Sequence, residues 1–336
     1  MSEVFFGGPD RPPRCLRDLL EARVAAVPSG GEIHWATYYF RDRALARALI
    51  AASDRGVRVT LHVEGRPRRA GVNAEVLAML SAHGLGGGLH IHRPAAELVA
   101  PLHPHLHAKI YAFSHPEPAV LVGSFNPSGD EPENADIIAE IGDQDRGHNV
   151  LVEYRDPEVV RVLSRHVDAI GGLFDRFRPR RSVEAADGTR FWFYPRLGTG
   201  IIDGALFGLG EGATIRGAIS HLKRGFLAER LAAAARAGAA VRLIVHDTER
   251  RVPEAAVTAL AEAGVAIARY ARPDGLPLHA KFLLVETPAE RSAWLGSFNY
   301  NPRSRYLNHE LLVRSREPGL FAALAARFEA IAGELG

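Results

Sequence analysis

Short β-like runs and amphipathic helical segments alternate along the first half of the chain. The runs are rich in β-branched and aromatic residues, and the helical segments repeat apolar residues every three or four positions. The predicted strands are 32–40, 57–65, 89–93, 106–113, 119–126 and 149–154. The predicted helices are 42–56, 73–84 and 159–174. Strands that alternate with helices predict an α/β fold, with a largely parallel or mixed sheet covered by helices.

The second half of the chain repeats this order of elements. Its predicted strands are 213–219, 241–247, 265–270, 278–286, 292–299 and 309–315. Its predicted helices are 226–238, 253–264 and 320–335. The repeat length is that of a domain, not of a solenoid unit. We therefore predict an internal duplication with halves at 1–180 and 181–336, joined by a linker around 175–189.

Two short sequences also recur, once in each half. LHAKIYAF at 106–113 corresponds to LHAKFLLV at 278–285, and GSFN at 123–126 recurs at 296–299. Their order and spacing are the same in both halves, which supports the duplication.

Charge is nearly balanced over the 336 residues, with a net charge of +2. Basic residues nevertheless cluster at 174–182 and at 221–230. Such clusters suit the phosphates of nucleic acid or lipid, although a solvated surface is the commoner role. The single cysteine, Cys15, excludes an intrachain disulfide, and we interpret it as a packing residue, not a nucleophile.

The N-terminal stretch MSEVFFGGPDRPPRC lacks the basic region and apolar run of a signal peptide. No run of about eighteen apolar residues, the length of a membrane-spanning helix, occurs in the sequence. We therefore expect a cytoplasmic protein whose contact with a membrane, if it has one, is peripheral.

Three histidines, His103, His105 and His107, occupy alternate positions before Lys109. Alternate residues of a strand face the same side, and clustered imidazoles can hold a zinc ion. The corresponding stretch of the second half is GLPLHAK, in which only the last histidine and the lysine recur. We therefore favour His107 with Lys109 as the chemical pair, interpret His103 and His105 as rim or packing residues, and expect no metal or cofactor.

Each copy of the repeat supplies an imidazole, an ammonium group, a hydroxyl and an amide. The candidate catalytic residues are His107, Lys109, Ser124 and Asn126 in the first half and His279, Lys281, Ser297 and Asn299 in the second. A glycine precedes each serine and allows another backbone to approach closely. Two such sets that face each other would surround one phosphate-sized anion, with lysines and asparagines stabilising charge on its oxygens.

H-x-K followed by G-S-x-N, twice in one chain, resembles the phospholipase D superfamily, often called the HKD family. The resemblance extends from about residue 30 to residue 335. It implies two pseudo-symmetric α-β-α sandwich halves with mixed sheets and one active site at their interface. It also implies a metal-independent mechanism, in which one histidine attacks phosphorus to form a phosphohistidine and the other protonates the leaving alkoxide. Imidazole suits both roles near pH 7.

The sequence departs from the family pattern at one carboxylate. The family usually has an aspartate five residues after the lysine, and Ser114 and Glu286 stand at these positions here. Glu286 can substitute for the aspartate, whereas Ser114 supplies no charge. The difference weakens the match without removing the chemistry, because that aspartate has a supporting role.

A second supporting carboxylate follows G-S-x-N in the family and orients a histidine through its other ring nitrogen. Glu310 stands at this position in the second half, and Asn149 stands there in the first. An acidic insertion, 127–147, precedes Asn149. Its Asp136 or Glu140 could serve the first histidine, or could lie in a solvated loop.

This asymmetry predicts the roles of the two histidines. We expect Glu310 to hold His279 more basic, so that His279 is the general acid and His107 the nucleophile. Decay of the first half to a non-catalytic domain is the alternative, and the retained His107 argues against it.

The second motif continues as GSFNYNPRSRYLNHELLV, which is similar to bacterial cardiolipin synthases and related phosphatidyltransferases. The resemblance therefore favours hydrolysis or transphosphatidylation of a phosphodiester in a phospholipid. A metal-independent nuclease and a non-catalytic phosphate- or lipid-binding protein are the alternatives. An apolar funnel over the histidines would favour lipid, and a long basic groove would favour nucleic acid.

Aromatic residues near the motifs could line a lipid or base pocket, or could belong to the core. They are Tyr38, Tyr39, Phe125, Phe298 and Tyr300. Because one chain contains both halves, we expect a monomer to be sufficient for activity.

Overall fold

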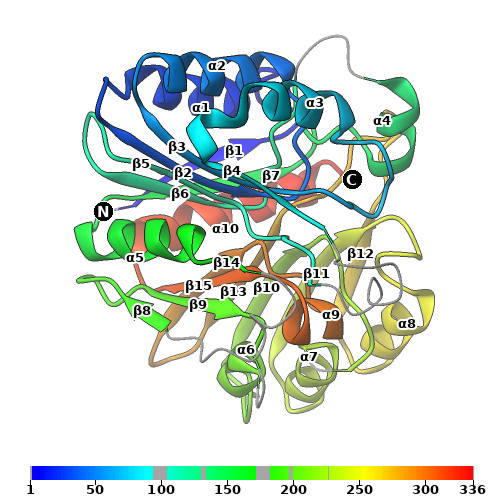
Figure 1. Cartoon of the computed structure of the whole chain (residues 1–336). Coiled ribbons are helices and arrows are strands. Elements are labelled where there is room, and N and C mark those ends of the chain that lie inside the picture. The colour runs from blue at the N-terminus through cyan, green and yellow to red at the C-terminus, as the bar shows by residue number, and fades with distance from the viewer. Residues whose placement is uncertain are drawn as a thin grey trace.

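The chain forms two β-sheets with helices on their outer faces and between them (Figure 1). The computed structural model describes residues 2–93, 104–129, 134–171, 182–196, 200–225 and 227–335. The predicted division at residue 180 lies outside these residues, and the second sheet begins just after it.

The first sheet is mixed and has the strand order β1-β7-β6-β5-β2-β3-β4. Its strands are β1 (Glu3–Gly7), β2 (Glu32–Thr37), β3 (Arg58–Glu64), β4 (Leu89–His92), β5 (Ile110–Phe113), β6 (Ala119–Gly123) and β7 (Asn149–Tyr154). β2, β3 and β4 run parallel, whereas β5, β6, β7 and β1 pair antiparallel with their neighbours. The predicted mixed sheet is confirmed.

The second sheet repeats this topology and has the order β12-β11-β10-β13-β14-β15-β9-β8. Its strands are β8 (Ser182–Glu184), β9 (Arg190–Tyr194), β10 (Thr214–Ile219), β11 (Ala240–His246), β12 (Ala266–Tyr270), β13 (Lys281–Glu286), β14 (Arg291–Gly296) and β15 (Glu310–Ser315). Read from β12 to β9, the order matches that of the first sheet from β4 to β1. The predicted duplication therefore extends to strand order.

Helices form three layers around the two sheets. Those of the first half are α1 (Cys15–Ala26), α2 (Arg43–Asp54), α3 (Ala74–His83), α4 (Ala135–Ile141) and α5 (Pro157–Asp168), with a 3₁₀ turn at Gly84–Gly87. Those of the second are α6 (Ile201–Ala205), α7 (Leu227–Arg236), α8 (Glu254–Glu262), α9 (Pro302–Tyr306) and α10 (Pro318–Gly333). In Figure 1, α1, α2 and α3 cover the outer face of the first sheet, and α7 and α8 lie beyond the second. Within the described residues, no helix is long and apolar enough to cross a bilayer.

The helices α5 and α10 lie between the two sheets (Figure 1). Asp156 caps α5 by accepting hydrogen bonds from the first turn, and Pro157 occupies a position where no amide donor is needed. Side chains of both helices join one hydrophobic core with strands of both sheets, including Leu163, Leu324 and Phe282. Because the halves share this core, they form one body and not two tethered domains.

The sequence did not predict the N-terminal elements β1 and α1, nor α4, β8, β9, α6 and α9. A signal for α1 is present, because Leu16, Leu20 and Val24 recur every four residues and are buried. The strand β1 pairs with β7 at the sheet edge and contains two phenylalanines. Because β1 is not next to another strand in the sequence, the periodicity of hydrophobic residues did not reveal it.

Close approach of two backbones requires the glycines that end β6 and β14. A Cβ at Gly123 would lie 2.0 Å from the carbonyl oxygen of Val150, and one at Gly296 would lie 2.2 Å from that of Leu311. Neither distance is compatible with a side chain, so any larger residue would push the neighbouring strand away. The expected role of Gly123 in close backbone approach is confirmed.

We predict that Gly123→Ala lowers the free energy of unfolding by about 3 kcal/mol, as for an overpacked core. Gly204→Ala, in α6, is the matched control because a Cβ there meets nothing within 4 Å. It should leave stability unchanged or raise it by about 0.5–1 kcal/mol. Urea unfolding followed by circular dichroism measures both, and equal stability of the two variants would contradict the prediction.

Candidate active site

The H-x-K motifs lie in extended segments that lead into β5 and β13. We expected both residues of each motif on a strand face, whereas only Lys281 belongs to a strand. The segment before β5 pairs instead with the other half, through a bridge between Leu106 and His309. The amide of His107 donates to the carbonyl of His309 (3.0 Å), and the amide of His309 donates to that of His105 (2.9 Å).

The same exchange occurs at the equivalent position of the other half. His148 and Leu278 form a bridge, the amide of His148 donates to the carbonyl of Pro277 (3.0 Å), and that of His279 donates to His148 (3.0 Å). Each motif histidine is therefore attached by its backbone to the half of the molecule that it does not belong to.

The side chain of His107 is held by Glu310 of the second half. The two groups meet at 2.8 Å between Nδ1 and Oε2, and Glu310 is fully buried. The hydroxyls of Ser297 and Ser304 donate to the same carboxylate, at 2.7 and 2.6 Å. The prediction that Glu310 supports His279 is wrong, because the crossing segments carry Glu310 to the opposite histidine.

Asn149 holds the side chain of His279 in the same way. Its Oδ1 lies 2.9 Å from Nδ1 of His279 and accepts a second hydrogen bond from the hydroxyl of Ser124 (2.8 Å). The amide nitrogen of Asn149 donates to the carbonyl of Gln144 (2.8 Å). A neutral amide thus occupies the place that a carboxylate occupies beside His107.

Neither Asp136 nor Glu140 of the acidic insertion serves His107. Glu140 forms ion pairs with Arg68 (3.3 Å) and Arg69 (2.9 Å), and Asp136 is exposed in the first turn of α4. The insertion contributes Gln144 instead, whose side-chain oxygen accepts a hydrogen bond from Asn126 (2.8 Å). Sequence reasoning missed Gln144, because a glutamine in an acidic stretch carries no signal of its own.

Both lysines are buried beside their histidines. The ammonium of Lys109 donates to the carbonyl of His107 (2.7 Å), and that of Lys281 donates to the carbonyl of His279 (2.6 Å). Burial lowers the pKa of Lys109 to about 7 and that of Lys281 well below its ordinary value. A neighbouring anion would raise both pKa values, so these two groups favour a negatively charged ligand.

Burial also lowers the pKa of both histidines, to about 4 for His107 and well below the ordinary value for His279. Glu310 opposes this effect at His107, whereas Lys281 adds to it at His279. We had expected Glu310 to keep a proton on His279, and this expectation is wrong. Its carboxylate holds a proton at Nδ1 of His107 and leaves Nε2 of that ring with the lone pair.

Both histidines line one cavity of about 370 Å³, whose walls come from both halves. Asn126 and Asn299 also line it, together with five cationic side chains. These are Arg68, Lys223, Arg250, Arg251 and Arg303. Among the described residues, no carboxylate lines the cavity. Ser124, Ser297 and the two motif lysines are not among the lining residues, and the serines act by positioning Asn149 and Glu310.

His105 also lines the cavity and lies 3.4 Å from Glu64, whereas His103 lies outside the described residues. In the described part of the chain, no three His, Cys, Asp or Glu side chains are arranged to hold a metal ion. Glu286, which we expect to substitute for the family aspartate, pairs with Arg291 at the far end of β13. Ser114 lies at the end of β5 and accepts from the amide of Glu32.

The aromatic residues divide between the cavity and the core. Tyr38 and Tyr39 line the cavity, whereas Phe125 and Phe298 belong to the hydrophobic core with Tyr300. Of the two basic clusters, 221–230 contributes Lys223 and also His221 to the cavity. The cluster at 174–182 lies outside the described residues except for its last residue.

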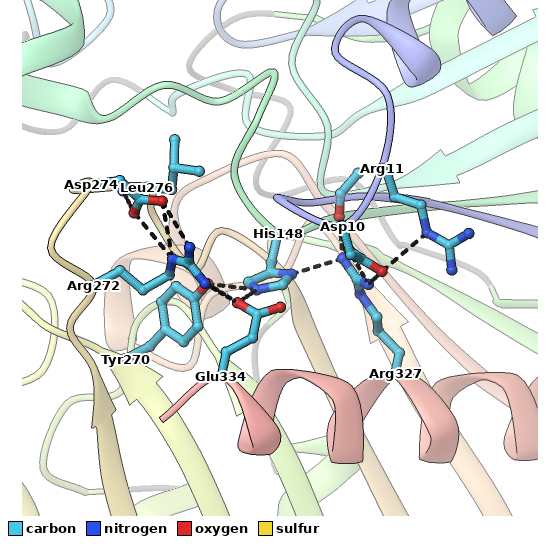
Figure 2. A network of polar contacts seen from close by, with 10 residues as sticks. Asp10, Arg11, His148, Tyr270, Arg272, Asp274, Leu276, Arg327 and Glu334 are labelled. Atoms are coloured by element: carbon cyan, nitrogen blue, oxygen red, sulfur yellow. Dashed lines mark hydrogen bonds and ion pairs between the residues drawn. The ribbon is translucent and has the colours of Figure 1, made fainter. Parts of the chain in front are cut away.

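A polar network anchors His148 next to the candidate site (Figure 2). Arg327 of α10 donates to its Nδ1 (2.8 Å), and Tyr270 and Glu334 lie 2.7 and 3.1 Å from its Nε2. Because arginine only donates, Nδ1 of His148 carries no proton and the ring is neutral. Burial and Arg327 lower its pKa to about 4. The network thus ties the last helix to the segment that carries Asn149.

Two α/β halves that each contribute one crosswise-held histidine to a shared cavity define a duplicated protein with one paired-histidine site. Residues 28–163 and 212–332 both match the family model described as "Cardiolipin synthase, PLD-like domain". The chain belongs to the phospholipase D superfamily and contains two such domains.

Two solved structures share the fold over nearly the whole chain. Phosphatidylserine synthase from Haemophilus influenzae Rd KW20 is 13% identical with a TM-score of 0.62, over 99% of this chain and 86% of that one. Polyphosphate kinase from Porphyromonas gingivalis is 15% identical with a TM-score of 0.63, over 99% and 50%. This chain therefore spans about half the length of the kinase chain. No curated protein sequence matches it.

We predict that the protein loses stability as the pH falls from about 6.5 to about 4, in part through His148. In this window the unfolded chain binds a proton that the buried ring does not, so unfolding becomes more favourable. His148→Gln should remove about 3 kcal/mol of this pH dependence. The measurement is the free energy of unfolding in urea at several pH values. His83→Gln, at an exposed histidine, is the control, and an unchanged slope in His148→Gln would contradict the assignment.

Proposed function

We propose that the protein is a metal-independent phosphodiesterase of the phospholipase D type, which hydrolyses a phosphodiester or transfers it to an alcohol. One observation carries this proposal: two histidines, each held at Nδ1 by the opposite half, line the same cationic cavity. Fixing Nδ1 directs Nε2 of each ring to the reaction, which is the arrangement needed for a nucleophile and an acid.

In the first step, Nε2 of His107 attacks phosphorus and forms a P–N bond while the P–O bond to the leaving group breaks. The imidazolium of His279 gives its Nε2 proton to the departing alkoxide. Glu310 stabilises the positive charge that develops on His107, and buried Lys109 and Lys281 stabilise the negative oxygens. We therefore keep His107 as the nucleophile, now because Glu310 supports it.

In the second step, His279 accepts a proton from water or an alcohol, and the oxygen of that molecule attacks phosphorus. The P–N bond breaks and His107 is regenerated. Bound phosphate would raise the pKa of His279 and supply the protonated ring that the first step needs. Both histidines come from one chain, so a monomer suffices in this proposal.

The substrate class follows from the family and from the cavity. The family model is named for cardiolipin synthase, which favours a phospholipid and peripheral contact with a membrane. Most residues that line the cavity are polar or cationic, and Tyr38, Tyr39 and Ile141 supply larger apolar surfaces. This lining suits the headgroup of a lipid, and its positive charge also supports the second candidate, a nuclease.

We predict that the protein hydrolyses bis(4-nitrophenyl) phosphate in excess EDTA, and that His107→Ala and His279→Ala each lower kcat at least about 1000-fold, as loss of a nucleophile or its acid does. Release of 4-nitrophenol measures the rate. His83→Ala is the control, because this exposed histidine lies outside the cavity. Loss of turnover to EDTA, or turnover that survives either variant, would contradict the mechanism.

We predict that Glu310→Gln and Asn149→Asp shift opposite limbs of the pH–rate profile. Glu310→Gln removes the carboxylate from His107, so kcat should fall about 10–100-fold and the acid limb should move to lower pH. Asn149→Asp adds a carboxylate beside His279, so the alkaline limb should move to higher pH. Profiles of kcat/KM from pH 4 to 10 measure both. Equal shifts in both variants would refute the assigned roles.

A further inference from the structure

Arginine pairs recur at equivalent positions in the two halves. Arg68 and Arg69 stand four and five residues after the end of β3, and Arg250 and Arg251 stand four and five residues after the end of β11. In the first half, Glu140 of α4 neutralises the pair. In the described part of the chain, no carboxylate lies within ion-pair distance of the second pair. The duplication has thus kept the cations and left one pair without a counter-charge.

Arg251 is the most confined of these cations, at 5% exposure. Its Nη2 donates to the carbonyl of Ile141 (3.1 Å) and its Nη1 to the hydroxyl of Ser220 (3.4 Å). Its buried Nε has no hydrogen-bond partner. Burial and the neighbouring Arg250 lower its pKa to about 10. A buried guanidinium among other cations is unfavourable unless an anion compensates it.

The second pair lines the same cavity as the two histidines. Arg250 and Arg251 line its wall with Lys223, whose ammonium donates to the carbonyl of Arg250. Arg251 and His279 line the same cavity, and the charge of Arg251 lowers the pKa values of His279 and Lys281. These three cations are separate from the motif lysines and are not needed to hold either histidine.

We propose that Arg250, Arg251 and Lys223 form a second anion site, and that the substrate carries another phosphate next to the scissile one, as in a diester of diphosphate. The proposal rests on the proposed function, because it takes the two histidines as the reaction centre. Arginine binds phosphate oxygens through paired N–H groups, which suits the two arginines of this pair.

A small substrate fits this site better than a nucleic acid strand. The cavity of about 370 Å³ is at the lower end of the range for small-molecule sites. The insertion restricts it, since Ile141 and Gln144 form part of its wall. Glu140 also neutralises the first arginine pair, so this pair adds no net positive charge to a surface along which a nucleic acid strand could bind. The positive charge of Arg250, Arg251 and Lys223 remains, and the negative charge of one diphosphate matches it.

The test compares inorganic diphosphate with inorganic phosphate by calorimetry and as competitive inhibitors of bis(4-nitrophenyl) phosphate hydrolysis. The full chain should bind diphosphate at least about 10-fold more tightly than phosphate, the gain expected from one charge-assisted contact. Arg250→Gln, at the exposed member of the pair, and Arg251→Gln should each remove most of this preference. Each variant should lower the affinity for diphosphate at least about fivefold more than the affinity for phosphate, which corresponds to the loss of one charge-assisted contact. Arg165→Gln, an exposed arginine on α5, is the charge-matched control.

Each outcome decides the proposal. Equal binding of phosphate and diphosphate, or a preference that survives both arginine variants, would overturn it even if hydrolysis occurs. If hydrolysis is absent but the diphosphate preference disappears in the variants, the second anion site holds and the proposed function fails. The small-substrate inference would be overturned in favour of nucleic acid if single-stranded oligonucleotides compete more strongly than diphosphate and their effect increases with their length. If Arg251→Gln folds poorly, Arg251→Lys replaces it in the test. This variant keeps the charge and should therefore retain part of the diphosphate binding.

Discussion

The crosswise support of the two histidines is the interaction on which the candidate site depends. Glu310 of the second half holds His107, and Asn149 of the first half holds His279. Paired backbone bridges bring these groups together, and the shared core around α5 and α10 keeps the bridges in place. Neither half could orient its own imidazole alone. A duplicated chain therefore has a reason to keep both domains in contact.

This arrangement concentrates positive charge in the interior of the molecule. Lys109 and Lys281 are buried, and burial lowers the pKa values of both lysines and of both histidines. The second arginine pair adds to the same field, with Arg251 buried and lacking a carboxylate partner in the described residues. Such a concentration of buried positive charge is unfavourable by itself and becomes more favourable when an anion binds.

The two halves share topology but differ in their supporting groups. A carboxylate contacts His107 and an amide contacts His279, and the serine of each G-S-x-N motif donates to that supporting group. The difference gives the two rings different electrostatic surroundings within one pseudo-symmetric frame. Our proposal of unequal roles for the two histidines rests on this difference.

The sequence alone determined the duplication, the mixed α/β fold and the histidine–lysine and serine–asparagine motifs. Hydrophobic periodicity and repeated motifs are local properties that can be read from short segments of the chain. The sequence did not reveal that Glu310 crosses to His107, since sequence distance suggested support within one half. The isolated edge strand β1 and the role of Gln144 were also hidden. Only the tertiary structure decided these points, because bridges such as that between Leu106 and His309 join segments far apart in the chain. The charge of the cavity has the same origin, because folding brings Arg250 and Arg251 to one wall with Lys223 and buries Arg251.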